Sequence, residues 1–304
     1  MASHHYPRIR TCSRSGYLLI REGLSLDFYM HRPHAELSRA VMNALTAYLR
    51  TVGPDALGLY ADEEGDWQKL DHAGWEHIRE KMNKRRWPII HLRDASNAED
   101  RYRFRYYGRP LDNPSRADRL GMTCAASFWL PTEYLEEHGP EKLRELAFEV
   151  AGHLPFCSGY VGLSFNCDTE LLGVEREIRQ QCFRYPGMDI PKPGDYSLHL
   201  GTQVRGSAWM TFLGQPVLGE LGGTSGLRSR LHSPGTTVQD MQGDRAVVTL
   251  GPWPEAGDTE QGQTLPAYRE LARVLEPWLY HEQSQGGTDF TPEDLRRWER
   301  RFLD

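Results

Sequence analysis

The spacing of hydrophobic and polar residues along the chain predicts an alternation of strands and helices. In the stretch GLSLDFYMH, residues 23–31, apolar and polar side chains alternate, which is typical of a half-buried strand. Residues 32–50 repeat apolar side chains at helical spacing, at Leu37, Val41, Ala44, Leu45 and Tyr48. The same criteria predict further strands over 87–94, 101–108, 121–131 and 158–166. They predict further helices over 75–82, 139–154, 171–183, 265–282 and 291–304.

The order of these elements predicts an α+β fold, in which mixed or antiparallel sheets are layered with helices. The series strand, long helix, strand and helix occurs twice, over residues 21–110 and again over 121–260. We therefore predict two related strand-helix-strand units within one domain of residues 21–285. Residues 1–20 form an N-terminal segment in this interpretation, and residues 286–304 form a C-terminal helix.

Composition and charge narrow the class of protein. The chain has 304 residues and a net charge of −6, which gives no sign of nucleic-acid binding. Its apolar runs are shorter than the ~20 residues of a membrane span, and the N-terminal stretch lacks the hydrophobic region of a signal peptide. We therefore expect a cytoplasmic protein. Five cysteines without CxxC spacing predict reduced, mostly buried thiols rather than disulfides or a zinc site.

Charged residues are distributed unevenly along the chain. Residues 51–68 carry five acidic side chains and no Lys or Arg, whereas residues 79–109 carry ten basic side chains against four acidic ones. The helix predicted over 139–154 adds an acidic stripe formed by Glu141, Glu145 and Glu149. We therefore expect one surface of the protein to be acidic and another to be basic.

The densest acidic stretch is LGLYADEEGDW, residues 57–67. It carries four acidic side chains around one glycine: Asp62, Glu63, Glu64 and Asp66. A calcium-binding EF-hand loop needs Gly at its sixth position and Glu at its twelfth, but counting from Asp62 gives Trp67 and Ala73. General acid–base catalysis needs carboxylates held in a cleft, and a surface loop does not provide one. Two interpretations remain, a solvated turn without a role or a patch that faces a protein partner.

Motifs that would indicate an enzyme are missing from the sequence. There is no Walker A or GxGxxG motif, and the glycine-rich segment 219–226 has the wrong spacing for both. His31 and His34 lack the glutamate of a zinc-binding helix, and Asp55 is not followed by the acidic-x-Lys arrangement of a metal-dependent nuclease. We therefore predict no catalytic residues, no metal site and no cofactor.

One stretch resembles a known family. The segment GTQVRGSAWMTFLGQPVLGELGG, residues 201–223, is similar to the signature of the type VI secretion immunity family (TsiV-like), formerly a bacterial domain of unknown function. The matching residues are Gly201, Gly206, Trp209, Thr211, Phe212, Leu213, Leu218, Leu221, Gly222 and Gly223. A looser likeness covers 121–166 and reaches back to about residue 20. We expect the aromatic and leucine residues of the signature to lie in the core, and we assign them no binding role.

The resemblance implies an immunity protein, one that binds and neutralises a toxic type VI secretion effector in the cytoplasm. Its family's effectors are mostly nucleases, which present basic grooves to phosphates, so acidic side chains on an inhibitor complement them. We therefore predict that the acidic stretch binds the effector. The predicted binding residues are Asp62, Glu63, Glu64 and Asp66, with Tyr60 or Trp67 as an aromatic anchor. We predict no nucleic-acid or membrane partner, and the oligomeric state stays open.

Two other functions remain open on the sequence. The chain could be an uncharacterised enzyme, which would show a deep cleft lined by titratable groups with shifted pKa values. It could also be an adaptor or chaperone that delivers an effector without blocking it. The strand predicted over 101–108 alternates Arg with aromatic residues, which fits either a core face opposite a solvated face or a platform for nucleic acid.

Overall fold

The computed structural model describes residues 6–14, 16, 18–95, 101–111, 121–169, 171, 173–281 and 289–304. Parts of the segments predicted over 1–20, 265–282 and 286–304 lie outside these residues. The fold is α+β with antiparallel strands, as predicted.

The chain forms two compact units. Unit 1 comprises Met1–Ser25, Ser158–Pro191 and Gln203–Asp304, and unit 2 comprises Leu26–Cys157 and Lys192–Thr202. The predicted domain bounds and internal repeat stay a prediction.

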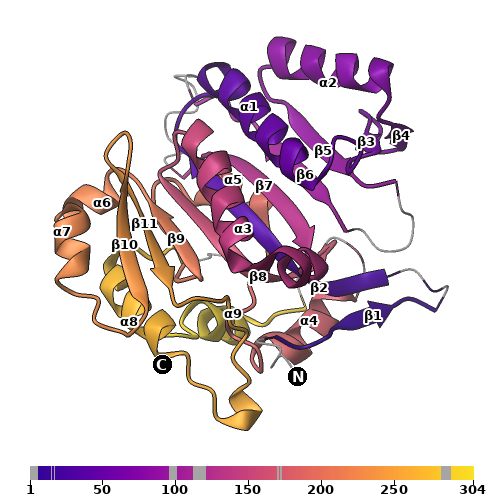
Figure 1. Ribbon diagram of the computed structural model, residues 1–304. Coiled ribbons are helices and arrows are strands. Elements are labelled where there is room, and N and C mark those ends of the chain that lie inside the picture. Colours follow the sequence, from indigo (N-terminus) through magenta and orange to yellow (C-terminus); the bar gives the residue numbers. More distant parts are fainter. Residues whose placement is uncertain are drawn as a thin grey trace. The chain divides into compact units, whose positions relative to one another are not determined.

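Unit 2 contains an antiparallel run of strands in the order β7-β6-β5-β3-β4. These strands are β7 (Cys124–Pro131), β6 (Arg103–Tyr107), β5 (Ile89–Arg93), β3 (Leu59–Ala61) and β4 (Trp67–Lys69). The helices of this unit are α1 (His34–Val52), α2 (His72–Lys84), α3 (Thr132–His153) and α5 (Pro193–His199). Helices α1 and α3 lie side by side, while α2 lies near β3 and β4 (Figure 1).

Aromatic side chains join α1 to the strands of unit 2. The Tyr48 ring lies 5.3 Å from that of Phe128, and the Tyr48 hydroxyl donates to the Trp129 carbonyl at 2.5 Å. His34, at the start of α1, contacts the ring of Tyr106 at 5.6 Å. Because Phe128 and Tyr106 lie on the same face of their strands, this face is covered by helices.

Helix α3 begins earlier than the sequence predicts. The predicted helix over 139–154 is present, but one further helical stretch precedes it from Thr132. Gly139 separates the two parts with a φ of 77°, a conformation that glycine adopts without steric cost. Pro140 then opens the second part, where its missing N–H is not needed.

Unit 1 contains an antiparallel run of strands in the order β10-β11-β9-β8. Its strands are β10 (Thr236–Met241), β11 (Arg245–Leu250), β9 (Met210–Leu213) and β8 (Ser158–Cys167), and β1 (Arg10–Cys12) pairs with the start of β2 (Leu18–Met30). Its α-helices are α4 (Val174–Cys182), α6 (Val217–Glu220), α7 (Gly223–Arg228), α8 (Pro266–Leu275) and α9 (Pro292–Glu299). Short 3₁₀ helices cover Thr259–Gln261 and Glu276–Trp278.

The core of unit 1 confirms the expectation for the signature segment. Trp209, Phe212 and Leu213 are all buried, at 1% exposure or less.

The helix predicted over 265–282 is shorter than expected, since α8 ends at Leu275 and a 3₁₀ turn containing Pro277 follows. The cysteines are free and all but Cys12 are buried, as predicted. No helix in the described part of the chain has the length and hydrophobicity needed to cross a membrane.

Strand β2 is buried along most of its length, so the prediction of a half-buried strand was wrong. Glu22, which precedes the predicted stretch, shows how one polar side chain of this strand is accommodated. Glu22 is fully buried, where it accepts a hydrogen bond from the Ile9 N–H at 2.7 Å and pairs with Arg10 at 2.5 Å. Within the predicted stretch, Ser25 and Asp27 are buried as well, at 3% and 0% exposure, so a polar side chain in an alternating pattern does not establish that a face is solvated.

For the strand predicted over 101–108, the interpretation of a core face opposite a solvated face was also wrong. All five residues of β6 are buried, with Arg103 at 2% exposure and Arg105 at 8%. Their guanidinium carbons lie 4.5 Å and 5.1 Å from the centroid of the Trp129 ring. The planar, weakly hydrated guanidinium stacks on an aromatic face, which makes its burial less costly than that of an ammonium.

The hydroxyl of Tyr48 provides a test of the helix–strand packing in unit 2. We expect Tyr48→Phe to lower the free energy of unfolding by about 1 kcal/mol, because the buried Trp129 carbonyl loses its donor. The midpoint of urea denaturation, at an unchanged m-value, measures this loss. A midpoint equal to that of the unsubstituted protein would show that the bond contributes nothing to stability.

Candidate partner-binding site

The acidic stretch forms a β-hairpin, whereas the sequence predicted a loop. Strands β3 and β4 pair with Leu59 opposite Lys69 and Ala61 opposite Trp67. The turn between them closes with a hydrogen bond from the Asp62 N–H to the Asp66 carbonyl at 2.9 Å. Gly65 occupies the turn with a φ of 92°, which other residues adopt only with strain. The hairpin therefore has a defined shape.

The carboxylate of Asp62 organises this turn. One oxygen accepts hydrogen bonds from the backbone N–H groups of Glu64, at 3.1 Å, and Asp66, at 2.9 Å. The other oxygen accepts from the Gln68 side chain at 2.7 Å. The Gln68 bond, helped by the backbone donors, holds the pKa of Asp62 below its ordinary value. Asp62 is therefore engaged within the turn, and we infer a structural role for it.

The two predicted aromatic anchors lie on opposite faces of the hairpin. Tyr60 stacks on His77 of α2, with ring centroids 5.2 Å apart. Trp67 lies on the other face, where the guanidinium carbon of Arg93 is 4.2 Å from its ring centroid. Tyr60 thus joins the hairpin to α2, and Trp67 is the anchor candidate on the face away from this helix.

Glu63 points back towards α2. Its carboxylate lies 3.4 Å from the Lys81 ammonium and 3.5 Å from the Arg85 guanidinium. The Lys81 side chain is only 9% exposed, so it needs a counter-charge. Glu63 supplies that counter-charge and adds little to the acidity that the hairpin presents.

Glu64 and Asp66 differ from the other two acids of the hairpin. Both residues are exposed, and their carboxylates form no hydrogen bond or ion pair with any part of the chain that the structure describes. They lie at the tip, held by the turn that Asp62 organises. Of the four predicted acidic residues, these two are the exposed ones that the described part of the chain leaves unpaired.

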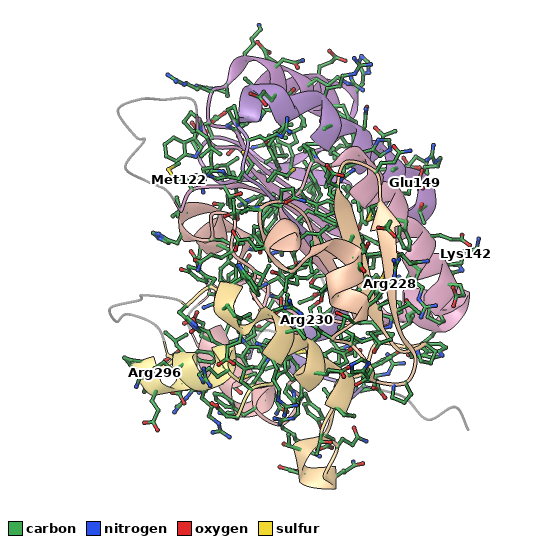
Figure 2. The ribbon with its side chains drawn as sticks, turned by 90° about the vertical axis from the view of Figure 1, so that its left-hand side faces the viewer. Met122, Lys142, Glu149, Arg228, Arg230 and Arg296 are labelled. Atoms are coloured by element: carbon green, nitrogen blue, oxygen red, sulfur yellow. The ribbon has the colours of Figure 1, made fainter. Side chains whose placement is uncertain are left out.

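The acidic stripe on α3 is balanced by neighbouring bases. Glu141 pairs with Arg144 and Glu145 pairs with Lys142, each at 2.6 Å. Glu149 pairs with Arg50 of α1. Figure 2 shows Lys142 and Glu149 along α3, among the side chains at the edge of the view. The stripe therefore presents mixed charges.

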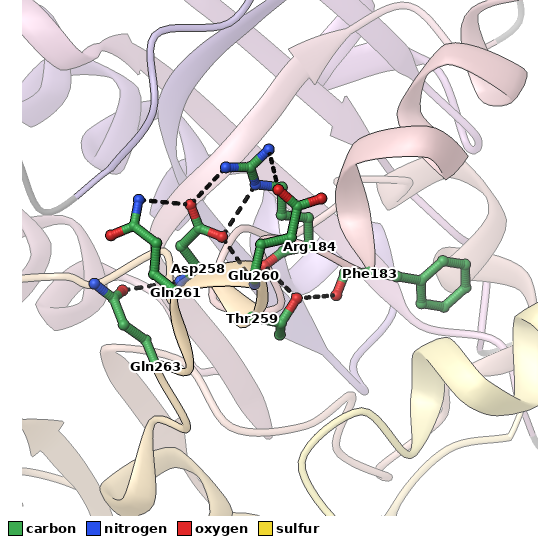
Figure 3. Close-up of polar contacts among 7 residues, drawn as sticks. All are labelled: Phe183, Arg184, Asp258, Thr259, Glu260, Gln261 and Gln263. Carbon is green, nitrogen blue, oxygen red and sulfur yellow. Dashed lines mark hydrogen bonds and ion pairs between the residues drawn. The ribbon is translucent and has the colours of Figure 1, made fainter.

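The polar cluster around Arg184 in unit 1 was not predicted from the sequence. Arg184 contacts Asp258 through two hydrogen bonds, at 3.0 and 2.8 Å, and Glu260 at 2.6 Å (Figure 3). The Asp258 backbone N–H donates to Gln263, and the Asp258 carboxylate accepts from Gln261. The bonds from Arg184 lower the pKa of Asp258 and keep it ionised. The cluster holds the loop before α8 in place.

The cavity beside this cluster tests the enzyme alternative. It measures about 520 Å³ and is lined by Tyr185, Glu255, Asp258 and neighbouring residues. A general acid would need a carboxyl with a raised pKa, but Asp258 is already paired and ionised. Another cavity contains Asp189, where burial opposes ionisation but Arg205 and Arg301 lower the pKa. Both carboxylates are therefore used as ion-pair partners.

His34, at the start of α1, has a structural explanation. His34 is buried, and its two ring nitrogens contact the Tyr106 hydroxyl at 2.9 Å and the Met82 carbonyl at 2.8 Å. Burial lowers the pKa of His34, although the Met82 bond opposes this. Neither nitrogen is left to bind a metal. Within the described ranges, no group of three or more His, Cys, Asp or Glu side chains could hold a metal ion.

Comparison with known proteins places the chain in a family. A family model described as "Type VI immunity for VRR-NUC" (TsiV) matches residues 40–302, which is most of the sequence. The chain belongs to this family of type VI immunity proteins. A solved structure, the Pseudomonas aeruginosa T6SS protein PA0821, is similar with a TM-score of 0.79 at 20% identity. The match covers 99% of this chain and 89% of that one, and it shows a shared fold. No curated protein matches the sequence.

Removing the Asp62 carboxylate tests its role in the turn. We expect Asp62→Ala to speed hydrogen exchange of the Glu64 and Asp66 amides about tenfold, because both lose their acceptor. Exchange followed by NMR measures the change, and Asp66→Ala serves as the matched control. The pKa of Asp62 is lower in the folded protein than in the unfolded chain. The stability that the Asp62 carboxylate contributes is therefore fully present above the unfolded-state pKa, and it is lost as the pH falls through the folded-state pKa. Equal exchange in both variants would contradict this role.

Proposed function

We propose that this protein binds and neutralises its cognate VRR-NUC effector in the cytoplasm, with the tip of the β3–β4 hairpin contacting basic groups of the effector. The observation that carries the proposal is the family match over residues 40–302. A nuclease acts where its nucleic-acid substrate is, which is why we propose the cytoplasm as the place of inhibition. We propose no catalytic role for the chain.

The charges of the hairpin support the choice of contact surface. A nuclease binds phosphates through basic side chains, and carboxylates can occupy such a groove in their place. Glu64 and Asp66 are exposed and unpaired within the described residues, whereas the glutamates of α3 are balanced by bases. Of the two acidic surfaces, the hairpin tip and the stripe on α3, the hairpin tip is therefore the better-supported contact for the effector.

Reversal of the hairpin charges tests this proposal. We expect the double substitution Glu64→Lys and Asp66→Lys to weaken effector binding by well over tenfold (about 1.4 kcal/mol per factor of ten). The two new ammonium groups would repel the basic groups of the effector that the carboxylates attract. Isothermal titration with a catalytically inactive effector measures the affinity. Glu141→Lys with Glu145→Lys makes the same change in net charge and should have a much smaller effect.

Co-expression in cells separates this function from its alternatives. An immunity protein restores growth to cells that produce the active effector, while an adaptor binds the effector without restoring growth. An unrelated enzyme neither binds it nor protects the cell. Full protection by the hairpin double variant, with unchanged affinity, would show that the hairpin is only a solvated turn.

A further inference from the structure

Strand alternation divides the sheet of unit 2 into two faces. One face carries Tyr60, Tyr106 and Phe128, which meet α1 and α2. The part of the opposite face on β3, β4 and β5 we call the open face. Its residues are Leu59, Ala61, Trp67, Lys69, Ile89, His91 and Arg93, and each of them is partly or fully exposed.

The registers place basic side chains in a row across this face. Lys69 lies opposite Leu59, and Leu59 lies opposite Arg93 on the next strand. Arg93 in turn lies opposite Arg103, so two arginines face one another directly across β5 and β6. This register places cationic side chains of neighbouring strands next to one another on the same face.

Arg93 has no counter-charge in the part of the chain that the structure describes. Its guanidinium carbon lies 4.2 Å from the centroid of the Trp67 ring, and its Nε is buried without a hydrogen-bond acceptor among the described residues. Lys69 is exposed and likewise forms no ion pair with the described residues. Stacking holds the Arg93 guanidinium in one plane, which prepares it to bind a carboxylate through two parallel hydrogen bonds.

Apolar side chains adjoin these cations. Ile89 is 41% exposed, which is unusual for a large aliphatic residue of a strand. Trp67 is partly exposed, and small Ala61 lies opposite it. Towards β6 and β7 the same face becomes buried, with Arg103 at 2% exposure and Trp129 at 1%. The exposure is thus confined to β3, β4 and β5.

We propose that the open face binds an acidic segment of the effector, with a carboxylate paired to Arg93 and apolar groups covering Trp67 and Ile89. This inference rests on the proposed function and specifies a second contact of opposite sign. The acidic tip, Glu64 and Asp66, directly adjoins Trp67 in the sequence. Adjacent patches of opposite charge fix the orientation of a partner and exclude proteins that carry one sign only.

A phosphate backbone fits this surface less well than a protein segment does. Single-stranded nucleic acid also binds cationic, aromatic surfaces. However, the acidic tip next to Trp67 and the net charge of −6 repel phosphates. The exposed Ile89 offers an apolar contact that phosphates cannot use.

Substitution of Arg93 in the full-length protein tests the inference. With a catalytically inactive form of the VRR-NUC effector paired with this chain as the probe, we expect Arg93→Gln to weaken binding at least about tenfold by titration calorimetry. Arg93→Lys keeps the charge but loses the two parallel bonds, so it should give an intermediate affinity. Arg39→Gln removes an exposed arginine of α1 and should change the affinity less than about twofold. Thermal unfolding of each variant verifies that the fold is kept.

The outcomes separate this inference from the proposed function. If the unsubstituted protein does not bind the effector, the proposed function fails, and the inference fails with it. If the unsubstituted protein binds the effector, and both Arg93→Gln and Arg93→Lys bind it as tightly as the unsubstituted protein does, only the inference is overturned. A fluorescent single-stranded oligonucleotide serves as a second probe. Tighter binding to this probe than to the effector, lost in Arg93→Gln, would overturn the inference in favour of nucleic acid.

Discussion

The Asp62 carboxylate and its three hydrogen-bond donors determine what the β3–β4 hairpin can present to a partner. Two of these donors are backbone N–H groups of the turn, and the third is the side chain of Gln68. This carboxylate is occupied in shaping the turn, and Glu63 is occupied in balancing Lys81. The two remaining acids therefore project from a fixed frame. A preorganised turn loses less conformational entropy on binding than a flexible loop would, which favours affinity.

The two aromatic residues of the hairpin lie on opposite faces and have different surroundings. Tyr60 packs on α2 and so holds the hairpin against the body of unit 2, while Trp67 is left on the open face beside Arg93. Gly74 of α2 makes this packing possible, because a Cβ there would lie 2.8 Å from the Lys69 carbonyl and 3.0 Å from the Tyr60 ring. The close approach of α2 to the hairpin thus depends on a residue without a side chain. In our account, one side of the hairpin provides support and the other side provides the contact.

Much of the fold could be predicted from periodicity, and the reasons for the exceptions are physical. Long helices such as α1 show a clear apolar stripe, and the signature residues around Trp209 are hydrophobic enough to be assigned to the core. The buried arginines of β6 could not be predicted, because their burial depends on Trp129, a residue far along the chain. For the same reason, the sequence alone could not show which acids were already paired. Glu63 pairs with Lys81 on α2, and Glu149 pairs with Arg50 on α1. The signal that could have pointed to Arg93 was the alternation of Ile89, His91 and Arg93 on one face of a predicted strand.

In both proposals, the hairpin and the open face of unit 2 contact the effector. Hydrogen exchange with mass spectrometry, on the protein alone and in complex with the inactive effector, tests this claim most directly. We predict slower exchange in the complex over residues 57–69 and 89–93, with little change in the exposed segments of unit 1. Protection confined to other segments, with unchanged exchange across these two, would contradict it.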